Sequence, residues 1–195
     1  MSPRLLAGRA PARLIDGIVT LLAAAGVTPM AVTLAGLAGS IGAAVLVARG
    51  ELVAGGIVLL VASALDMFDG ALARATGKAS RLGALVDSTA DRLSEAALLF
   101  GMLVHTTGLG DRELSLLVFA VAIGSMLVSY MRARAEGEGL ELTAGIFTRT
   151  ERIVVLSAAL ISGWLRAGLW VLAALTLVTA AQRMFLAIRA LREDN

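Results

Sequence analysis

Cysteine is absent from this sequence, and charged residues are scarce. Without cysteine the chain forms neither disulfide bonds nor thiolate metal sites. Cysteine content therefore does not indicate whether the protein works in a reducing or an oxidising compartment. Charged residues make up 16% of the chain and the formal net charge is +2, which is too small for nucleic acid to be the natural partner. Neither an internal repeat nor a low-complexity linker interrupts the sequence, so we expect a single domain over residues 1–195.

Hydrophobic residues, in contrast, are abundant. They make up 58% of the chain, against roughly 45–50% in soluble domains. They are gathered into runs, and a helix that crosses a bilayer needs about 20 such residues. The sequence therefore predicts an all-α integral membrane protein with a six-helix transmembrane bundle over residues 29–192. The six expected spans are Met30–Ala48, Leu52–Leu65 with a helical extension towards Arg74, Leu82–His105, Leu114–Met131, Ile153–Leu165 and Ala167–Gln182.

Basic residues are distributed unequally between the two ends of these spans. An even number of spans places both termini on one side, and the opposite side holds only Arg49, Arg112 and Arg166. The basic residues on the side of the termini are Arg4, Arg9, Arg13, Arg74, Lys78, Arg81, Arg132, Arg134, Arg149, Arg152, Arg183, Arg189 and Arg192. Because cytoplasmic loops are enriched in arginine and lysine, we expect a multi-pass protein of the cell (inner) membrane whose termini face the cytoplasm. Trp164 and Trp170 would then lie near the far interface.

The N-terminal segment is expected to form a different kind of helix. Residues 3–25 carry Arg9, Arg13 and Asp16 on one helix face. Apolar residues recur at helical spacing on another face, at Leu14, Ile15, Ile18, Val19 and Leu22. This pattern is typical of an amphipathic juxtamembrane helix that lies in the membrane interface. A secretory signal peptide is the alternative, because a basic start precedes the apolar run 17–27 and small residues.

Four aspartates lie in one register within the second and third expected spans. Asp66 and Asp69 are three residues apart, and Asp87 and Asp91 are four apart, so each pair shares one helix face. Carboxylates within a membrane-length apolar segment are costly and are usually functional. If the two helices pack against each other, the four carboxylates converge and repel one another. A hard cation with oxygen ligands, Mg²⁺ or Mn²⁺, would relieve that repulsion.

Interhelical ion pairs are the alternative to a metal site. The candidate partners are Arg74, Arg81 and Arg92. Ion pairing, however, needs neither the fixed intervals between the acids nor the glycines beside them. Gly70 and Gly83 would let a bulky phosphate-bearing ligand approach the backbone. The spacing therefore favours a metal and phosphate site.

The aspartates belong to a longer pattern, Asp66-x2-Asp69-Gly70-x2-Ala73-Arg74-x8-Gly83-x3-Asp87-x3-Asp91. This pattern resembles the signature of the CDP-alcohol phosphotransferase (CDP-alcohol phosphatidyltransferase) family at every fixed position. The resemblance implies a Mg²⁺-dependent transferase of phospholipid biosynthesis. Such an enzyme moves the phosphatidyl group of CDP-diacylglycerol onto an alcohol and releases CMP. The resemblance also implies a homodimer.

The resemblance further implies a role for each aspartate. Asp66, Asp69 and Asp87 would bind metal together with the diphosphate of the donor. Asp91 would also lie at the metal and would act as the general base that deprotonates the acceptor hydroxyl. The residues expected to bind the CDP-lipid are Met30, Ala31, Val32, Thr33, Asp66, Asp69, Gly70, Ala73, Arg74, Ser80, Gly83 and Asp87. Glu95, one turn beyond Asp91, is expected to pair with a polar group on another span.

Two arginine-containing stretches bear on the acceptor. Residues 129–137 and 148–152 resemble segments of actinobacterial phosphatidylinositol-phosphate synthases. That resemblance implies inositol phosphate as the acceptor. Arg132, Arg149 and Arg152 would form its basic pocket, because guanidinium groups bind phosphate bidentately. The positive-inside bias alone is the other explanation for these arginines.

Two further functions stay open. Glycerol 3-phosphate as the acceptor would give a phosphatidylglycerol-phosphate synthase, which would use the same acids and a similar basic pocket. A divalent-cation transporter would need carboxylates near the bilayer midplane. Asp87 and Asp91 instead lie close to the expected cytoplasmic start of their span. That location favours a transferase whose water-soluble acceptor meets a lipid donor at the interface.

Overall fold

The computed structural model describes residues 9–140 and 145–193, and this part of the chain folds into seven α-helices. Their bounds are α1 Arg9–Ala24, α2 Pro29–Ala48, α3 Leu52–Ala75, α4 Arg81–Gly108, α5 Arg112–Gly137, α6 Arg149–Ser162 and α7 Leu165–Glu193. Each of the six expected spans overlaps one of the helices α2 to α7. Residues 3–8 of the expected N-terminal helix, including Arg4, lie outside the described residues.

Side chains before four of the helices fix where those helices begin. Thr28, Ser80 and Asp111 accept a hydrogen bond from the first turn of α2, α4 and α5, respectively. Before α6, the backbone N–H of Thr148 donates to the Glu151 carboxylate at 2.8 Å. These caps satisfy N–H groups that have no partner within the helix. At Asp111, the hydrogen bond from the Leu114 N–H, together with nearby Arg166, holds the pKa of the carboxyl below its usual range.

The boundary between the last two helices differs from the expected one. The sequence prediction placed the break at Arg166 because it is charged. In the structure α6 ends at Ser162, and Gly163 follows with φ 78°. Glycine adopts this left-handed conformation without steric cost and commonly ends helices. Arg166 lies instead in the first turn of α7, where its guanidinium pairs with Asp111 at 2.6 Å.

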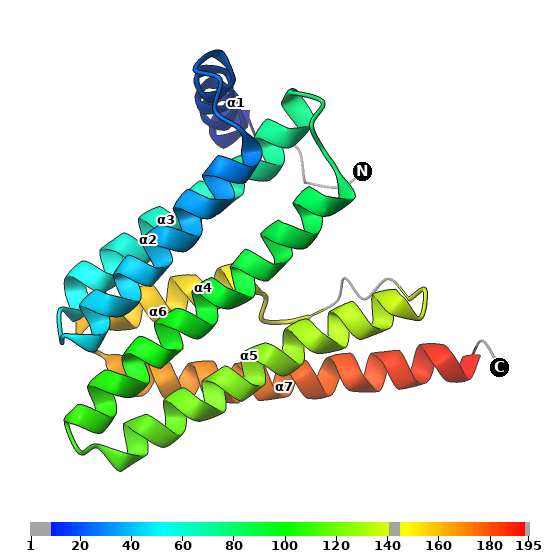
Figure 1. The fold of residues 1–195 in the computed structure, drawn as a ribbon. Coiled ribbons are helices and arrows are strands. Elements are labelled where there is room, and N and C mark those ends of the chain that lie inside the picture. Colours follow the sequence, from blue (N-terminus) through cyan, green and yellow to red (C-terminus); the bar gives the residue numbers. More distant parts are fainter. Residues whose placement is uncertain (1–8, 141–144, 194–195) are drawn as a thin grey trace.

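Helices α2 to α7 form a closed ring (Figure 1). Going around it, α2 packs against α3, α3 against α6, α6 against α7, α7 against α5, α5 against α4, and α4 against α2. Fully buried apolar side chains fill the middle of the ring, among them Leu98, Met102, Val118, Leu160 and Leu169. The order around the ring differs from the order in the sequence, so side chains far apart in the chain meet inside it.

The first helix lies against the end of the bundle where α2 begins (Figure 1). It packs on α3, and its buried Val19 contacts a small apolar cluster with Val32 of α2 and Leu72 of α3. Asp16, one turn before Val19, is exposed. The amphipathic helix in the membrane interface stays a prediction.

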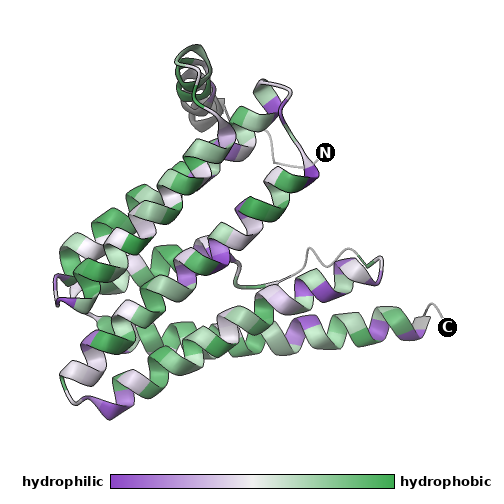
Figure 2. Ribbon diagram, viewed as in Figure 1, coloured by the Kyte–Doolittle hydropathy of each residue, from purple (hydrophilic) through white to green (hydrophobic). Residues whose placement is uncertain are grey.

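The outside of the bundle is apolar along most of its length (Figure 2). Large hydrophobic side chains are exposed there, such as Val61, Phe100, Phe119 and Phe185. By length and composition, α2, α3, α5 and α7 are able to cross a membrane. The charged residues of α4 set it apart from these four, and α6 has only 14 residues, or about 21 Å of helix. The fold is that of an α-helical membrane protein.

Glycines allow the closest helix crossings in the ring. A Cβ atom at Gly101 of α4 would overlap the backbone carbonyl of Ala44 in α2, and one at Gly39 would lie 2.9 Å from the Ala62 Cβ atom in α3. Gly42, in contrast, has open space where its Cβ atom would lie. The small residues of α2 therefore pack within the chain at some positions and face outward at others.

We expect Gly101→Ala to destabilise the protein by on the order of 1–3 kcal/mol, because backbone atoms of α2 must move to admit the methyl group. The thermal unfolding midpoint in detergent measures this change. Gly42→Ala is the matched control and should not lower the midpoint. Equal midpoints for the two variants would contradict the tight α2–α4 crossing.

Candidate active site

The four aspartates meet beside α2. The sequence analysis assumed that the two acidic helices pack directly on each other. In the structure, α3 and α4 both pack against α2 instead. Gly36 of α2 makes room for the Asp66 carboxylate, because a Cβ atom at this position would overlap Asp66 Oδ1. Thr33 of α2 donates its hydroxyl hydrogen to Asp69 Oδ2 at 2.6 Å, and Asp69 is buried. Helix α2 thus positions both acids of α3. Gly36 leaves room for the Asp66 carboxylate, and Thr33 holds the Asp69 carboxylate by a hydrogen bond.

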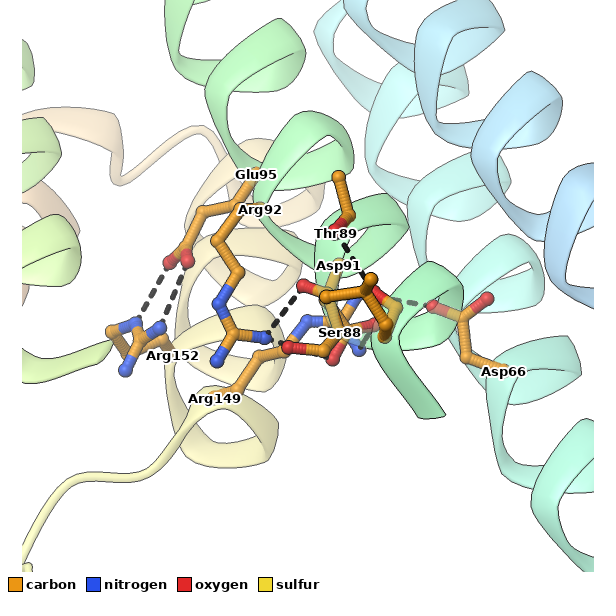
Figure 3. A network of polar contacts seen from close by, with 9 residues as sticks. Asp66, Ser88, Thr89, Asp91, Arg92, Glu95, Arg149 and Arg152 are labelled. Carbon is orange, nitrogen blue, oxygen red and sulfur yellow. Dashed lines mark hydrogen bonds and ion pairs between the residues drawn. The ribbon is translucent and has the colours of Figure 1, made fainter. Parts of the chain in front are cut away.

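Arg149, the first residue of α6, joins two of the four aspartates (Figure 3). Its Nη2 atom lies 3.0 Å from Asp66 Oδ2, and its Nη1 atom lies 2.7 Å from Asp91 Oδ1. Of the arginines considered as ion-pair partners from the sequence, Arg92 lies 3.5 Å from Asp91 Oδ2. The sequence analysis assigned Arg149 to the acceptor pocket alone. Arg149 and Asp66 are 83 positions apart in the sequence, so no local sequence pattern predicts their contact.

The arrangement of the acids fits a divalent cation by its chemistry. As the side chains stand, no group of three acidic or histidine residues in the described part of the chain encloses a common ion position. Four carboxylates on two helices nevertheless form an oxygen donor set of the kind that Mg²⁺ and Mn²⁺ prefer. The guanidinium of Arg149 is a positive counter-ion for two of these carboxylates.

A groove of about 360 Å³ lies on one side of the acids. It is formed by the start of α2, the end of α3, the α3–α4 turn and the start of α4. Nine of the twelve residues expected to bind the CDP-lipid line it, namely Met30, Thr33, Asp69, Gly70, Ala73, Arg74, Ser80, Gly83 and Asp87. Lys78 also lines the groove and was not among the expected residues. Its position in the polar α3–α4 turn, between Arg74 and Ser80, could have indicated that it belongs to the site.

The other three expected CDP-lipid residues do not line the groove. Val32 is buried in the apolar cluster beneath α1, and Ala31 is exposed at the start of α2. Asp66 pairs with Arg149. In a helix, neighbouring residues point in different directions, so a continuous stretch such as 30–33 does not share one environment.

A second cavity, of about 170 Å³, lies on the other side of the acids between α4, α5, α6 and α7. The three arginines expected to bind the acceptor line it, namely Arg132, Arg149 and Arg152. Arg183 of α7 lines it as well, and its Nη1 atom donates to the Val128 carbonyl at 2.7 Å. We refer to this space as the basic cavity. Sequence analysis missed Arg183 as a site residue, although a buried charge in a long apolar helix is a signal for function.

Glu95 holds one of these arginines. Its carboxylate accepts from Arg152 Nε at 2.7 Å and from Arg152 Nη2 at 2.8 Å, and the two side chains are 14% and 3% exposed (Figure 3). The expectation that Glu95 pairs with a polar group on another span is confirmed. A bidentate pair of this kind fixes the guanidinium plane, so Arg152 enters the basic cavity in one orientation.

The aspartates divide between the two spaces. Asp69 and Asp87 line the groove, and Asp91 lines the basic cavity. A phosphate-bearing ligand in the groove and an anionic ligand in the basic cavity would therefore meet at the acids. This layout, within a bundle of membrane-capable helices, defines a membrane-embedded transferase of phosphorylated substrates.

Comparison with known proteins agrees with that class. The family model of CDP-alcohol phosphatidyltransferases matches residues 19–187, and the chain belongs to this family. It is 40% identical over 182 residues to phosphatidylinositol phosphate synthase from Mycobacteroides abscessus, which covers 89% of this chain and 83% of that protein. It is 39% identical to archaetidylinositol phosphate synthase from Pyrococcus horikoshii over 173 residues, 88% of this chain and 89% of the relative.

Solved structures of a third relative have the same fold. The crystal structure of Mycobacterium tuberculosis phosphatidylinositol phosphate synthase with CDP-DAG bound superposes with a TM-score of 0.82 at 34% identity, and covers 90% of this chain and 94% of that one. The structure of the same relative in complex with manganese and citrate also gives 0.82 at 34% identity, and covers 89% and 88% of the two chains.

We expect Glu95→Gln to lower the stability by on the order of 3 kcal/mol, because it leaves the buried charge of Arg152 without its counter-ion. Thermal unfolding in detergent measures the effect. Glu138→Gln is the control, since Glu138, directly after α5, forms an exposed pair with Arg134 of that helix, and such pairs contribute about 1 kcal/mol or less. An equal, small effect for both variants would contradict a structural role for the buried pair.

Proposed function

We propose that this protein transfers the phosphatidyl group of CDP-diacylglycerol to a hydroxyl group of inositol phosphate and releases CMP. The observation that carries the proposal is the position of the aspartates between a groove and a separate cavity lined by five arginines. The names of two relatives, phosphatidylinositol phosphate synthase and archaetidylinositol phosphate synthase, share the inositol phosphate headgroup and differ in the lipid. The basic cavity is thus the part of the site that the acceptor would occupy.

The proposed reaction takes place at the cytoplasmic side of the membrane. The excess of basic residues at one end of the bundle supports this orientation, with both termini on that side. In the same proposal α2 to α7 are six transmembrane helices, because they form one ring, and α1 lies in the interface. The homodimer that the family resemblance implies stays a prediction.

The groove provides the contacts that a CDP-lipid requires. Arg74 and Lys78 line it and would bind phosphate oxygens of the donor. At Gly70 and Gly83 the groove wall has no side chain. The Arg74 side chain lies next to Gly70, and its Nη1 atom would be 3.4 Å from a Cβ atom at that position. We propose that the diphosphate lies at the end of the groove next to Asp69 and Asp87.

The four aspartates would hold Mg²⁺ or Mn²⁺. A divalent ion bound there would stabilise negative charge on the diphosphate and on the departing CMP. The protein must also keep the carboxylates apart from one another until they bind the ion. Arg149 offsets the repulsion between Asp66 and Asp91 in that state, since its guanidinium pairs with both.

Asp91 is the proposed general base, because it is the only one of the four aspartates that lines the basic cavity. The Asp91 carboxylate would take the proton of the acceptor hydroxyl as that oxygen attacks the phosphorus that bears the diacylglycerol. The bond from this phosphorus to CMP breaks as the new phosphodiester bond forms. Arg92 and Arg149 contact Asp91 and hold its carboxylate at the border between the two spaces.

The experiment that tests the proposal measures CMP release by the purified protein with CDP-diacylglycerol and Mg²⁺. Inositol phosphate and glycerol 3-phosphate are compared as acceptors at equal concentrations. We expect a higher kcat/KM with inositol phosphate. A higher kcat/KM with glycerol 3-phosphate would show that this compound, and not inositol phosphate, is the acceptor. The absence of CMP release with either acceptor would contradict the proposed reaction.

We expect Asp91→Asn to lower kcat by at least about 100-fold, since general-base catalysis contributes roughly 10²–10⁴-fold. Binding of CDP-diacylglycerol, measured by titration, should change little, because Asp91 does not line the groove. Asp69→Asn should weaken that binding in the same assay. Loss of donor binding in the Asp91 variant with unchanged turnover would contradict the assigned role.

Arg132→Gln should raise the KM for the acceptor by about tenfold, as expected for the loss of a charge-assisted hydrogen bond, and should leave the KM for the donor unchanged. Arg134→Gln is the matched control, because Arg134 lies on the same helix but does not line the basic cavity. Equal effects of Arg132→Gln on both substrates would count against an acceptor pocket at this place.

A further inference from the structure

A small enclosed cavity lies at the centre of the ring, behind Arg149. Its volume is about 20 Å³, and residues from each of the helices α2 to α7 line it. A cavity needs roughly 10–15 Å³ to hold one water molecule. Its polar lining residues are Ser40, Ser63, Ser94, Glu95, Arg149 and Arg152. It is therefore large enough for one water molecule, and its polar side chains lie among apolar ones such as Leu59, Leu98 and Leu172.

Three of the atoms in this lining are buried and have no hydrogen-bond partner among the described residues. They are the hydroxyl oxygens of Ser40 and Ser63 and the Nε atom of Arg149. Helical hydroxyl groups elsewhere in the chain, such as those of Thr76 and Thr179, donate to the carbonyl four residues earlier. Because buried polar groups without partners are costly, the meeting of three such atoms at one cavity points to a shared ligand.

We propose that this cavity binds one water molecule, and that Ser40 and Ser63 are positioning residues that act through it on Arg149. The water would accept a hydrogen bond from the Arg149 Nε–H group and donate to the two serine oxygens. Three bonds are typical of a buried water molecule. A metal cation is the less favourable ligand, since two positively charged residues, Arg149 and Arg152, line the same space and would repel it.

The water would complete the fixation of the Arg149 guanidinium. Asp66 holds its Nη2 atom and Asp91 holds its Nη1 atom, so the water would bind the third side. A guanidinium that is held on three sides keeps its plane and its place at the wall of the basic cavity. Without the water, Arg149 would still pair with the acids but would turn about the axis through them.

The inference about catalysis rests on the proposed function, in which Arg149 lines the basic cavity that the acceptor would occupy. We expect Ser40→Ala and Ser63→Ala each to raise the KM for inositol phosphate by about tenfold, with less than a twofold change in the KM for the donor. Ser157→Ala is the matched control. Ser157 is as buried as Ser40 and its hydroxyl is also unpartnered within the described chain, but it does not line the cavity.

A double-mutant cycle separates positioning from a general structural effect. Arg149→Lys keeps a positive charge and removes the Nε–H group, so adding Ser63→Ala to it should have little further effect on the acceptor KM. If the two substitutions instead raised the acceptor KM by independent factors that multiply in the double variant, the coupling through water would be overturned. Identical kinetics for the Ser40, Ser63 and Ser157 variants would overturn it as well.

A structure of the full-length protein at a resolution that shows ordered water tests the site without an activity assay. We expect density for one water molecule within hydrogen-bond distance of Ser40 Oγ, Ser63 Oγ and Arg149 Nε, and its loss in the Ser40→Ala, Ser63→Ala double variant. A dry cavity in the unmodified protein would overturn the proposal. If the protein released no CMP with inositol phosphate, the proposed function would fail, and the density would still decide whether the water site exists.

Discussion

Repulsion among four carboxylates in an apolar bundle is the constraint on which the rest of this structure depends. Burying charges without partners costs several kcal/mol for each ion. The bundle meets this cost with a guanidinium from α6 between Asp66 of α3 and Asp91 of α4. Thr33 and Gly36 of α2 give two of the carboxylates a hydrogen bond and the space they need. The ring of helices brings these groups together, because α2 lies between the two acidic helices and α6 lies beside α3.

The same cluster separates two environments that differ in charge. On one side the groove mixes apolar walls with Arg74 and Lys78, which suits a nucleotide attached to a lipid. On the other side several arginines line a smaller cavity, where Glu95 fixes one of them. In the proposed reaction each substrate would therefore meet its own set of contacts, and only the reacting atoms would need to approach the acids. Substitution of arginines in the basic cavity would change which acceptor the enzyme prefers and would leave the residues of the groove in place.

The sequence predicts the local features of this protein well. Long apolar runs indicate the helices, and the spacing of the aspartates places each pair on one face, because both signals come from residues within a few turns. The break between α6 and α7 was misplaced because Gly163, and not the charged Arg166, ends the helix. The contact of Arg149 with Asp66 and the place of Arg183 were not predicted. Both depend on the order of helices around the ring, which hydrophobic periodicity does not encode. Val32 and Thr33 are neighbours in the sequence, yet one packs beneath α1 and the other binds Asp69.

The sequence separation between Asp66 and Arg149 has a consequence for biosynthesis. Asp66 and Asp91 lie on helices α3 and α4, which are synthesised before residue 149. Until α6 packs against α3, the acidic helices must keep their carboxylates in contact with water or lipid headgroups. Packing of α6 then brings Arg149 to both acids, and α7, which follows it in the chain, completes the ring. The chain from Arg149 onward therefore completes the environment of the acids that precede it.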